Sequence, residues 1–198
     1  FDPVIDNALA AGNEIPEPLA AKAAARRALQ EQGTDKANQP HTLPEHIRKL
    51  FPSRFQFTEE LGWIPEGWQT GTLSSVTTEL RRGISPKYVD EGGVRVINQR
   101  CIRDHIINVG PSRQHDAAQR KVDGRLLSVG DVLVNSTGVG TLGRIAQVYE
   151  LNEATVVDSH VTVVRPSVDY FKPYVFGRLM FSIESAVEAL GTGSTGQT

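Results

Sequence analysis

The chain has 198 residues, of which 39% are hydrophobic and 22% are charged, and its formal net charge is −2. This balance is typical of one well-buried globular domain with appendages, and it excludes a disordered or collagen-like chain. No apolar run approaches the roughly 20 residues that a membrane helix needs. A single cysteine, Cys101, excludes an internal disulfide and a multi-cysteine zinc site, and fits a cytoplasmic location.

The first 57 residues are predicted to form a connector with short helices. Residues 1–4 should be extended, because the residue before Pro3 avoids the helical region. Alanine-rich residues 19–32, after Pro18, predict a helix. Residues 33–43 are polar and favour an exposed loop, and Pro44 should open a second short helix.

Residues 58–198 are predicted to form the globular domain. Apolar spacing indicates a helix over 72–80, stopped by a left-handed Gly83, and a helix over 170–190 that ends at Gly191. Residues 112–121 favour a short helix or a loop. Runs of β-branched residues predict strands at 94–97, 106–109, 132–136, 144–149, 155–157 and 161–164. The fold class expected is α+β, with a β-rich body of mixed or antiparallel strands, flanking helices and long loops.

Charge is unevenly distributed. Residues 81–125 contain ten Lys or Arg and five Asp or Glu, a local charge of +5, so the rest of the chain carries −7. A basic middle in an acidic chain is typical of a surface that faces a polyanion. The alternative is a solvated, arginine-rich face.

Motifs for catalysis or metal binding are missing. The sequence has no Gly-x4-Gly-Lys-Ser/Thr, no His-Glu-x-x-His and no Gly-x-Ser-x-Gly, and its five histidines lack metal-ligand spacing. Cys101 lies near Arg100 and Arg103, which would lower the pKa of its thiol, but a structural role is the simpler interpretation. No catalytic, cofactor-binding or metal-binding residue is predicted, and the chain is not expected to be an enzyme.

One glycine motif leaves two interpretations open. Residues 138–143 match Gly-x-Gly-x-x-Gly, they follow a predicted strand, and Asp158 lies 20 residues after Gly138. That spacing fits a dinucleotide-binding fingerprint. However, the residues after Gly143 favour a strand rather than the helix that the fingerprint needs. The second interpretation is a glycine-rich hairpin whose backbone approaches another group closely.

Several segments, taken in order, resemble a known family. They are 1–4 (FDPV), 50–55 (LFPSRF), 60–68 (ELGWIPEGW), 83–88 (GISPKY), 130–134 (GDVLV), 137–138 (TG), 142–144 (LGR) and 193–197 (GSTGQ). Together they look like the specificity subunit of a type I restriction–modification system. The resemblance covers essentially the whole chain. It implies that residues 58–198 are the second target recognition domain of such a subunit, preceded by its connector and cut before the following long pairing helix.

The resemblance also implies a role and partners. The domain would read one half of a bipartite double-stranded DNA target without catalysis of its own. Methyltransferase subunits and a restriction subunit would be its partners, and S-adenosylmethionine, ATP and Mg would belong to them. The sequence agrees by omission, since it contains neither Asn-Pro-Pro-Tyr/Phe nor Asp-Pro-Pro-Tyr/Phe and no P-loop. The long pairing helices are missing, and no membrane contact is expected.

Candidate DNA-binding residues follow from their chemistry and position in the predicted loops. Arg and Lys suit guanine and phosphate, while Asn and Gln suit adenine. The candidates are Arg81, Arg82, Ser85, Lys87, Tyr88, Asn98, Gln99, Arg100, Arg103, Arg113, Gln114, Ser136, Thr137, Arg144 and His160. Two alternatives remain at this point: a dinucleotide-binding enzyme fragment that uses Gly138, Gly140 and Gly143, and a protein-interaction module whose basic window meets an acidic partner.

Overall fold

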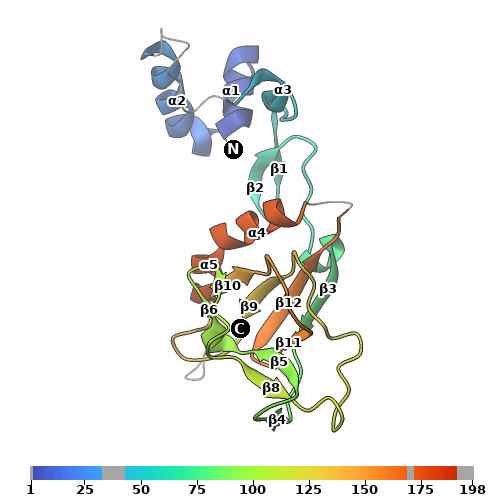
Figure 1. Ribbon diagram of the computed structural model, residues 1–198. Helices are drawn as coiled ribbons and strands as arrows, with labels where there is room; N and C mark the ends of the chain where they lie inside the picture. Colours follow the sequence, from blue (N-terminus) through green and yellow to red (C-terminus); the bar gives the residue numbers. More distant parts are fainter. Residues whose placement is uncertain (1, 33–42, 169–171, 191–198) are drawn as a thin grey trace. The chain divides into compact units, whose positions relative to one another are not determined.

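The computed structural model describes residues 2–32, 43–168 and 172–190, and Figure 1 draws the chain in colours that follow the sequence. Contacts divide the chain into two compact units, residues 1–70 and 71–198. Helices occur together with mostly antiparallel strands, which confirms the predicted α+β class. The predicted recognition domain, 58–198, stays a prediction, because compactness alone does not define it. Within the described ranges, no helix has the length and apolar character to cross a membrane.

The first unit begins with helix α1 (Asp2–Ala11), where an extended start was predicted. Pro3 lies in the first turn of this helix, where a missing N–H removes no hydrogen bond. Helix α2 (Ala20–Gln32) confirms the predicted alanine-rich helix and packs against α1. An ion pair joins the two helices, because Arg26 Nε donates to Asp6 Oδ1 at 2.6 Å.

A short helix and a hairpin complete this unit. Helix α3 (Glu45–Arg48) follows Pro44, as predicted, and the 3₁₀ turn η1 (Glu17–Leu19) precedes α2. Strand β1 (Phe55–Thr58) pairs antiparallel with β2 (Gly62–Pro65). Apart from Leu43, the predicted loop at 33–43 lies outside the described residues.

The second unit is built on a four-stranded antiparallel sheet in the order β10-β9-β12-β3. Its strands are β3 (Thr77–Arg82), β9 (Val132–Asn135), β10 (Ile145–Gln147) and β12 (Val161–Pro166). Helix α4 (Pro173–Ser182) packs against β10, and the short α5 (Glu184–Ala189) follows it (Figure 1).

A second sheet has the order β11-β5-β8-β4. Its strands are β4 (Tyr88–Val89), β5 (Val94–Ile97), β8 (Arg113–His115) and β11 (Thr155–Val157). Strands β11 and β5 are parallel and the other pairs are antiparallel, so the unit is mixed, as predicted. A small hairpin, β6 (Ile102–Arg103) and β7 (Ile106–Ile107), and two 3₁₀ turns, η2 (Leu73–Val76) and η3 (Gln99–Cys101), complete it.

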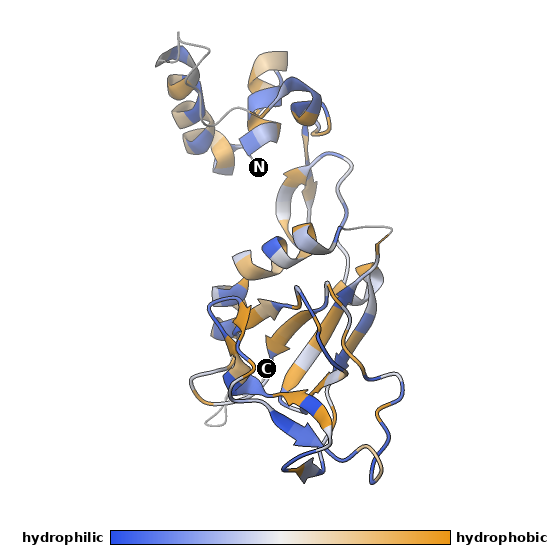
Figure 2. Cartoon of the chain, in the orientation of Figure 1, coloured by the Kyte–Doolittle hydropathy of each residue, from blue (hydrophilic) through white to orange (hydrophobic). Residues whose placement is uncertain are grey.

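The core lies on both faces of the first sheet, because successive side chains of a strand point to opposite sides. Val132 of β9 packs with Phe176 of α4 on one side. Leu133, the next residue, packs with Ile97 and Val157 of the second sheet on the other. Figure 2 shows mostly hydrophobic residues along β9 and β12, whereas β8 and much of the loops are hydrophilic.

The predicted helix over 72–80 is wrong. Residues 73–76 form η2, and β3 follows directly at residue 77. Half-buried residues alternate with exposed ones along β3, which is the period of a strand, and β12 pairs with it along its length except at one bulge. Pairing with a neighbouring strand therefore outweighs a local apolar spacing that also fits a helix. Gly83 is not left-handed either; a Cβ there would lie 2.1 Å from the Asp158 carbonyl oxygen, so this glycine serves close approach.

Two further predictions need correction. Residues 113–115 form strand β8, where a short helix or a loop was predicted for 112–121, because β5 and β4 pair with them from both sides. The predicted helix over 170–190 is two helices, since Ile183 leaves the helical region with φ −105° and ψ 4°. Residues 169–171 and the predicted stop at Gly191 lie outside the described residues.

Candidate nucleic-acid interface

The glycine motif at 138–143 joins β9 to β10, which are antiparallel neighbours. Gly138, Gly140 and Gly143 have φ angles of 114°, 72° and 84°, in the left-handed region that favours glycine. A dinucleotide fingerprint needs a helix after its third glycine, whereas strand β10 follows Gly143 here. The segment is therefore a hairpin connection, in agreement with the second interpretation.

Segments far apart in the sequence end beside this hairpin. Arg82, the last residue of β3, donates from Nε to the Ser159 carbonyl at 2.9 Å. Thr137 Oγ1 lies 2.5 Å from His160 Nδ1 in a hydrogen bond. Ser136 is half-buried, and its hydroxyl is bonded to that of Thr162. The loop at 158–160 is therefore held between β3 and the hairpin.

Gln99 connects a further loop to the same place. Its carbonyl accepts a hydrogen bond from Asn135 Nδ2 at 3.0 Å. Its side chain lies against Gly138, where a Cβ would come within 2.3 Å of Gln99 Oε1. The absence of a side chain at Gly138 therefore makes room for the loop that carries Gln99 and its exposed neighbour, Arg100.

Asp158 lies at the centre of these loops and is only 4% exposed. Its Oδ1 accepts the His160 backbone N–H at 2.9 Å. Burial raises the pKa of this carboxyl, and the hydrogen bond from His160 and the charges of His160 and Arg82 only partly oppose the rise. The ionised carboxylate is thus held in an unfavourable setting close to the surface.

Tyr88 and Arg113 lie beside the same loops. The Arg113 guanidinium carbon lies 3.5 Å from the centre of the Tyr88 ring, a cation–π contact. Burial raises the pKa of the Tyr88 hydroxyl, and so does the charge of Asp158, while Arg113 and Arg100 lower it. These charges act on the hydroxyl because the residues lie close to it.

We call this region the loop surface and define it by five exposed side chains around the buried Asp158. They are Arg82, Tyr88, Arg100, Arg113 and His160. All five are predicted DNA-binding residues. The surface therefore combines three guanidinium groups, an imidazole and a phenol. Arg82 and His160 act on the buried carboxyl of Asp158, and Arg100 and Arg113 act on the hydroxyl of Tyr88.

Other predicted residues have partners inside the protein. Asn98 is buried and caps η3, since its Oδ1 accepts the Arg100 N–H at 2.9 Å and its Nδ2 donates to the Pro111 carbonyl at 2.7 Å. Gln114 Oε1 accepts the Gly93 N–H at 2.7 Å. The amides of these two residues hold loops in place.

Three predicted arginines lie in different settings. Arg81 is half-buried in β3, and its Nε donates to Glu79 Oε2 at 2.7 Å. Arg144 donates from Nη2 to the Gly140 carbonyl at 2.7 Å and closes the glycine hairpin. Arg103 has a side chain that is 75% exposed, on the small hairpin of β6 and β7. None of the three is among the residues that define the loop surface.

Ser85 and Lys87 belong to a neighbouring loop. Ser85 lines a hollow of about 290 Å³ together with the basic residues Arg120, Lys121 and Arg125. The Ser85 carbonyl accepts a bond from Arg120 Nη1 at 3.1 Å. These three basic residues are not among the predicted DNA-binding residues, although they lie in the basic window that signals such a role.

The buried His115 joins these loops. Its Nδ1 accepts the Lys87 backbone N–H at 2.8 Å, so its Nε2 carries the proton and donates to the Arg120 carbonyl at 2.8 Å. This histidine is fully buried and serves the fold.

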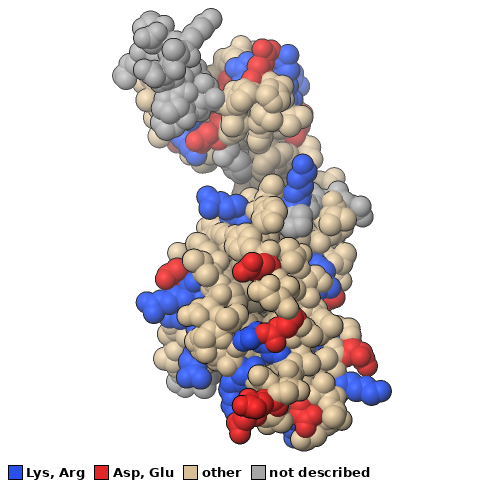
Figure 3. Space-filling view, in the orientation of Figure 1, with Lys and Arg blue, Asp and Glu red and all other residues tan. Residues whose placement is uncertain are grey.

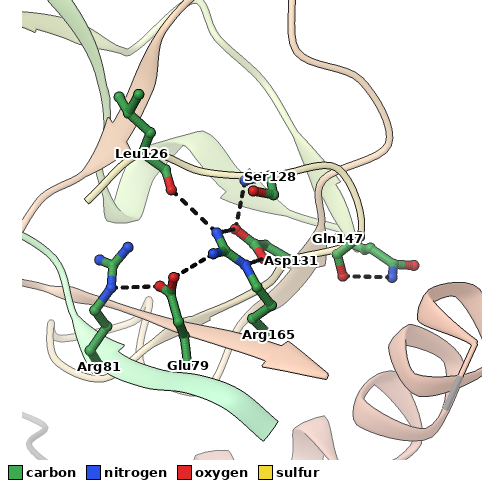
Figure 4. Close-up of polar contacts among 8 residues, drawn as sticks. Glu79, Arg81, Leu126, Ser128, Asp131, Gln147 and Arg165 are labelled. Atoms are coloured by element: carbon green, nitrogen blue, oxygen red, sulfur yellow. Dashed lines mark hydrogen bonds and ion pairs between the residues drawn. The ribbon is translucent and has the colours of Figure 1, made fainter. Parts of the chain in front are cut away.

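A charged network at the edge of the first sheet also serves the fold (Figure 4). Arg165 holds Asp131 through two hydrogen bonds of 2.6 and 2.8 Å and also pairs with Glu79. It donates to the Leu126 carbonyl at 3.2 Å, and Asp131 accepts the Ser128 N–H at 2.8 Å. Bonding to Asp131 raises the pKa of Arg165 further. The network fixes the loop that leads into β9 and accounts for Asp131 before that strand.

The thiol of Cys101 and groups of metal-ligating side chains are the features that would point to catalysis. Cys101 is fully buried, and burial raises the pKa of its thiol, although Asn98, Arg100 and Arg95 act in the opposite direction. Arg100 lowers this pKa in the predicted direction, but desolvation outweighs its charge, so the pKa of the thiol is raised overall. In the described part of the chain, no three His, Cys, Asp or Glu residues lie close enough to hold a metal ion.

Charge is mixed on one face of the second unit. On the face that Figure 3 shows, basic and acidic side chains lie interspersed over this unit. The +5 of the basic window therefore does not form one continuous basic face there. The local concentration of arginines at the loop surface is the more specific feature.

Comparison with known proteins finds structural similarity but no match by sequence. No protein-family model and no curated protein matches the chain. Among solved structures, the chain is similar to the HsdS subunit from Thermoanaerobacter tengcongensis, with a TM-score of 0.49 and 19% sequence identity. The similarity covers 66% of this chain and 31% of that one, so the chain matches less than a third of the length of that subunit.

Proposed function

We propose that this chain recognises sequence in double-stranded DNA through the loop surface. One observation supports this above all: the ends of strands and the loops beside them bring three exposed arginines, Tyr88 and His160 into one region with the buried Asp158. Guanidinium groups bind phosphate oxygens and also the acceptor edge of guanine in the major groove. A surface of this kind supplies both positioning and sequence readout.

The proposal extends to the context that the sequence resemblance implies. The chain would read one half of a bipartite target within a type I restriction–modification complex, in the cytoplasm. Methyltransferase subunits and a restriction subunit would be its partners. S-adenosylmethionine, ATP and Mg would bind to those subunits, and this chain would perform no catalysis. The segments 60–68, 130–134 and 142–144 carry this part of the proposal.

The test is selection of bound duplexes from a randomised pool, at low and at moderate salt, using the 198-residue chain. We expect one short motif to be enriched and to bind about ten-fold or more tightly than a scrambled duplex. Affinity should fall as salt rises, because phosphate contacts release counterions. Binding without a motif would leave a general polyanion contact and contradict the proposal.

Two variants sharpen this test. Arg100→Ala should lower affinity for the motif, because its side chain lies on the loop surface. Arg178→Ala removes an exposed arginine of α4 and should leave both affinity and motif unchanged. Equal losses in the two variants would show that binding follows net charge rather than this surface.

A further inference from the structure

Arg113 occupies a special position on the loop surface. It is the first residue of β8, where it pairs with Val96 of β5. Its guanidinium lies 3.5 Å from the centre of the Tyr88 ring, and Tyr88 pairs with His115 two residues further along the same strand. The sheet therefore fixes both residues of the stack, and the orientation of the guanidinium does not rely on a loop.

The donors of Arg113 are free of protein partners among the described residues. Its neighbours on these strands are engaged: Arg95 binds Glu153 and Ser112 at 2.6 and 2.7 Å, and Gln114 binds the Gly93 N–H. Stacking on an aromatic ring uses the face of the guanidinium and leaves its N–H groups directed outward in the plane. Arg113 thus presents a pre-oriented pair of donors to a ligand.

The geometry of Arg113 suits a planar pair of acceptors. The guanidinium carbon lies 3.5 Å from the centre of the Tyr88 ring, so the donors of Arg113 lie in one fixed plane. A base edge is neutral, and guanine presents two coplanar acceptors, N7 and O6, that match two donors of an arginine.

We propose that Arg113, held on the Tyr88 ring, reads a guanine in the DNA target of this chain. This inference rests on the proposed function and adds to it the residue and the base. Tyr88 is then a positioning residue. It fixes the plane of the guanidinium and so reduces the conformational entropy that the Arg113 side chain loses on binding. In this proposal Arg113 reads a base directly, and the other arginines of the loop surface contact phosphates or other bases.

The experiment repeats the duplex selection with four variants and the wild type. The wild-type motif should contain a guanine whose replacement lowers affinity about ten-fold or more. Arg113→Ala should abolish that preference while the other positions of the motif persist. Arg113→Lys should keep the charge and most of the salt dependence, but lose most of the preference, because lysine lacks the planar fork. Tyr88→Phe keeps the ring and should keep the preference, whereas Tyr88→Leu should weaken it.

The outcomes separate the two proposals. If the wild-type chain enriches no motif, the proposed function fails and this inference fails with it. If the wild-type motif is unchanged in Arg113→Ala, the proposed function stands and the inference is overturned. An Arg113→Ala variant that binds all duplexes equally less well, with a salt slope reduced by about one, would identify a phosphate contact and also overturn it. Thermal melting of each variant shows that it is folded.

Discussion

In the described part of the second unit two aspartates are buried, and their environments are opposite in kind. Asp131 is 1% exposed, and Arg165 binds both of its carboxylate oxygens. Asp158 is 4% exposed, and among the described residues no basic group lies within ion-pair distance of its carboxylate. The first charge is compensated inside the fold, whereas the second is not.

The difference separates the scaffold from the candidate site. A buried carboxylate that is bound by a guanidinium fixes the elements that carry the two groups. A buried carboxylate without such a partner opposes folding when it is ionised, which is the reason that the pKa of Asp158 is raised. The arginines near Asp158 point to the surface, where a ligand reaches them. Arg165, by contrast, has its donors occupied by Asp131, Glu79 and Leu126.

The largest expected effect comes from Arg165→Ala. This change leaves the Asp131 carboxylate buried and unpaired, so we expect the free energy of unfolding to fall by about 3–5 kcal/mol. Urea denaturation of the variant and the wild type measures the loss. The double variant Arg165→Met with Asp131→Leu removes both charges and should recover most of it. A loss of stability below about 1 kcal/mol in Arg165→Ala would show that the fold tolerates the buried Asp131 carboxylate without its basic partner, and the contrast with Asp158 would fail.

The next effect tests how closely the scaffold approaches the loop surface. In Gly83→Ala the new Cβ would meet the Asp158 and Val157 carbonyl oxygens at 2.1 and 2.2 Å. We expect a loss of about 2–3 kcal/mol, because backbone must shift, and weaker DNA binding, because the loop at 158–160 moves with it. Gly110→Ala is the matched control; its Cβ would meet only the Asn108 side chain, at 3.2 Å, and should change stability by under about 0.5 kcal/mol. Equal losses of stability in the two variants would refute the close approach of Gly83 to the Asp158 and Val157 carbonyl oxygens.

Strong local patterns allowed much of the fold to be predicted. The strands at 94–97 and 155–157 and the alanine-rich helix follow from β-branched runs and from helix propensity. The predictions for 72–80 and for 113–115 failed because strands outside each local window pair with these segments. Such pairing adds a stabilisation that no local window contains.

The candidate site was predicted as a list of residues and not as an arrangement. Arg82, Arg100 and Arg113 could be named from charge and position, but nothing in the sequence indicates that they lie in one region with Tyr88 and Asp158. In the sequence, Arg81 and Arg82 look alike, yet strand alternation directs them to opposite faces, and Arg81 pairs with Glu79. Side-chain direction along a strand therefore decides which of two adjacent arginines reaches the surface.

The smallest expected effect has the opposite sign and bears directly on the contrast between the aspartates. Because folding raises the pKa of Asp158 above the ordinary value of 3.8, the folded state binds its proton more tightly than the unfolded state. The ionised carboxylate therefore costs stability at neutral pH, and the cost disappears as the pH falls through the raised pKa towards 3.8.

Asp158→Asn keeps an oxygen for the His160 N–H and removes the charge. We expect no loss of stability at neutral pH, or a slight gain, and a smaller increase in stability than the wild type shows on acidification. Unfolding curves across this pH range measure both the stability at neutral pH and its change on acidification. A marked loss of stability in Asp158→Asn at neutral pH would mean that the charge of Asp158 is compensated within the fold, as that of Asp131 is. The two carboxylates would then not distinguish the scaffold from the candidate site.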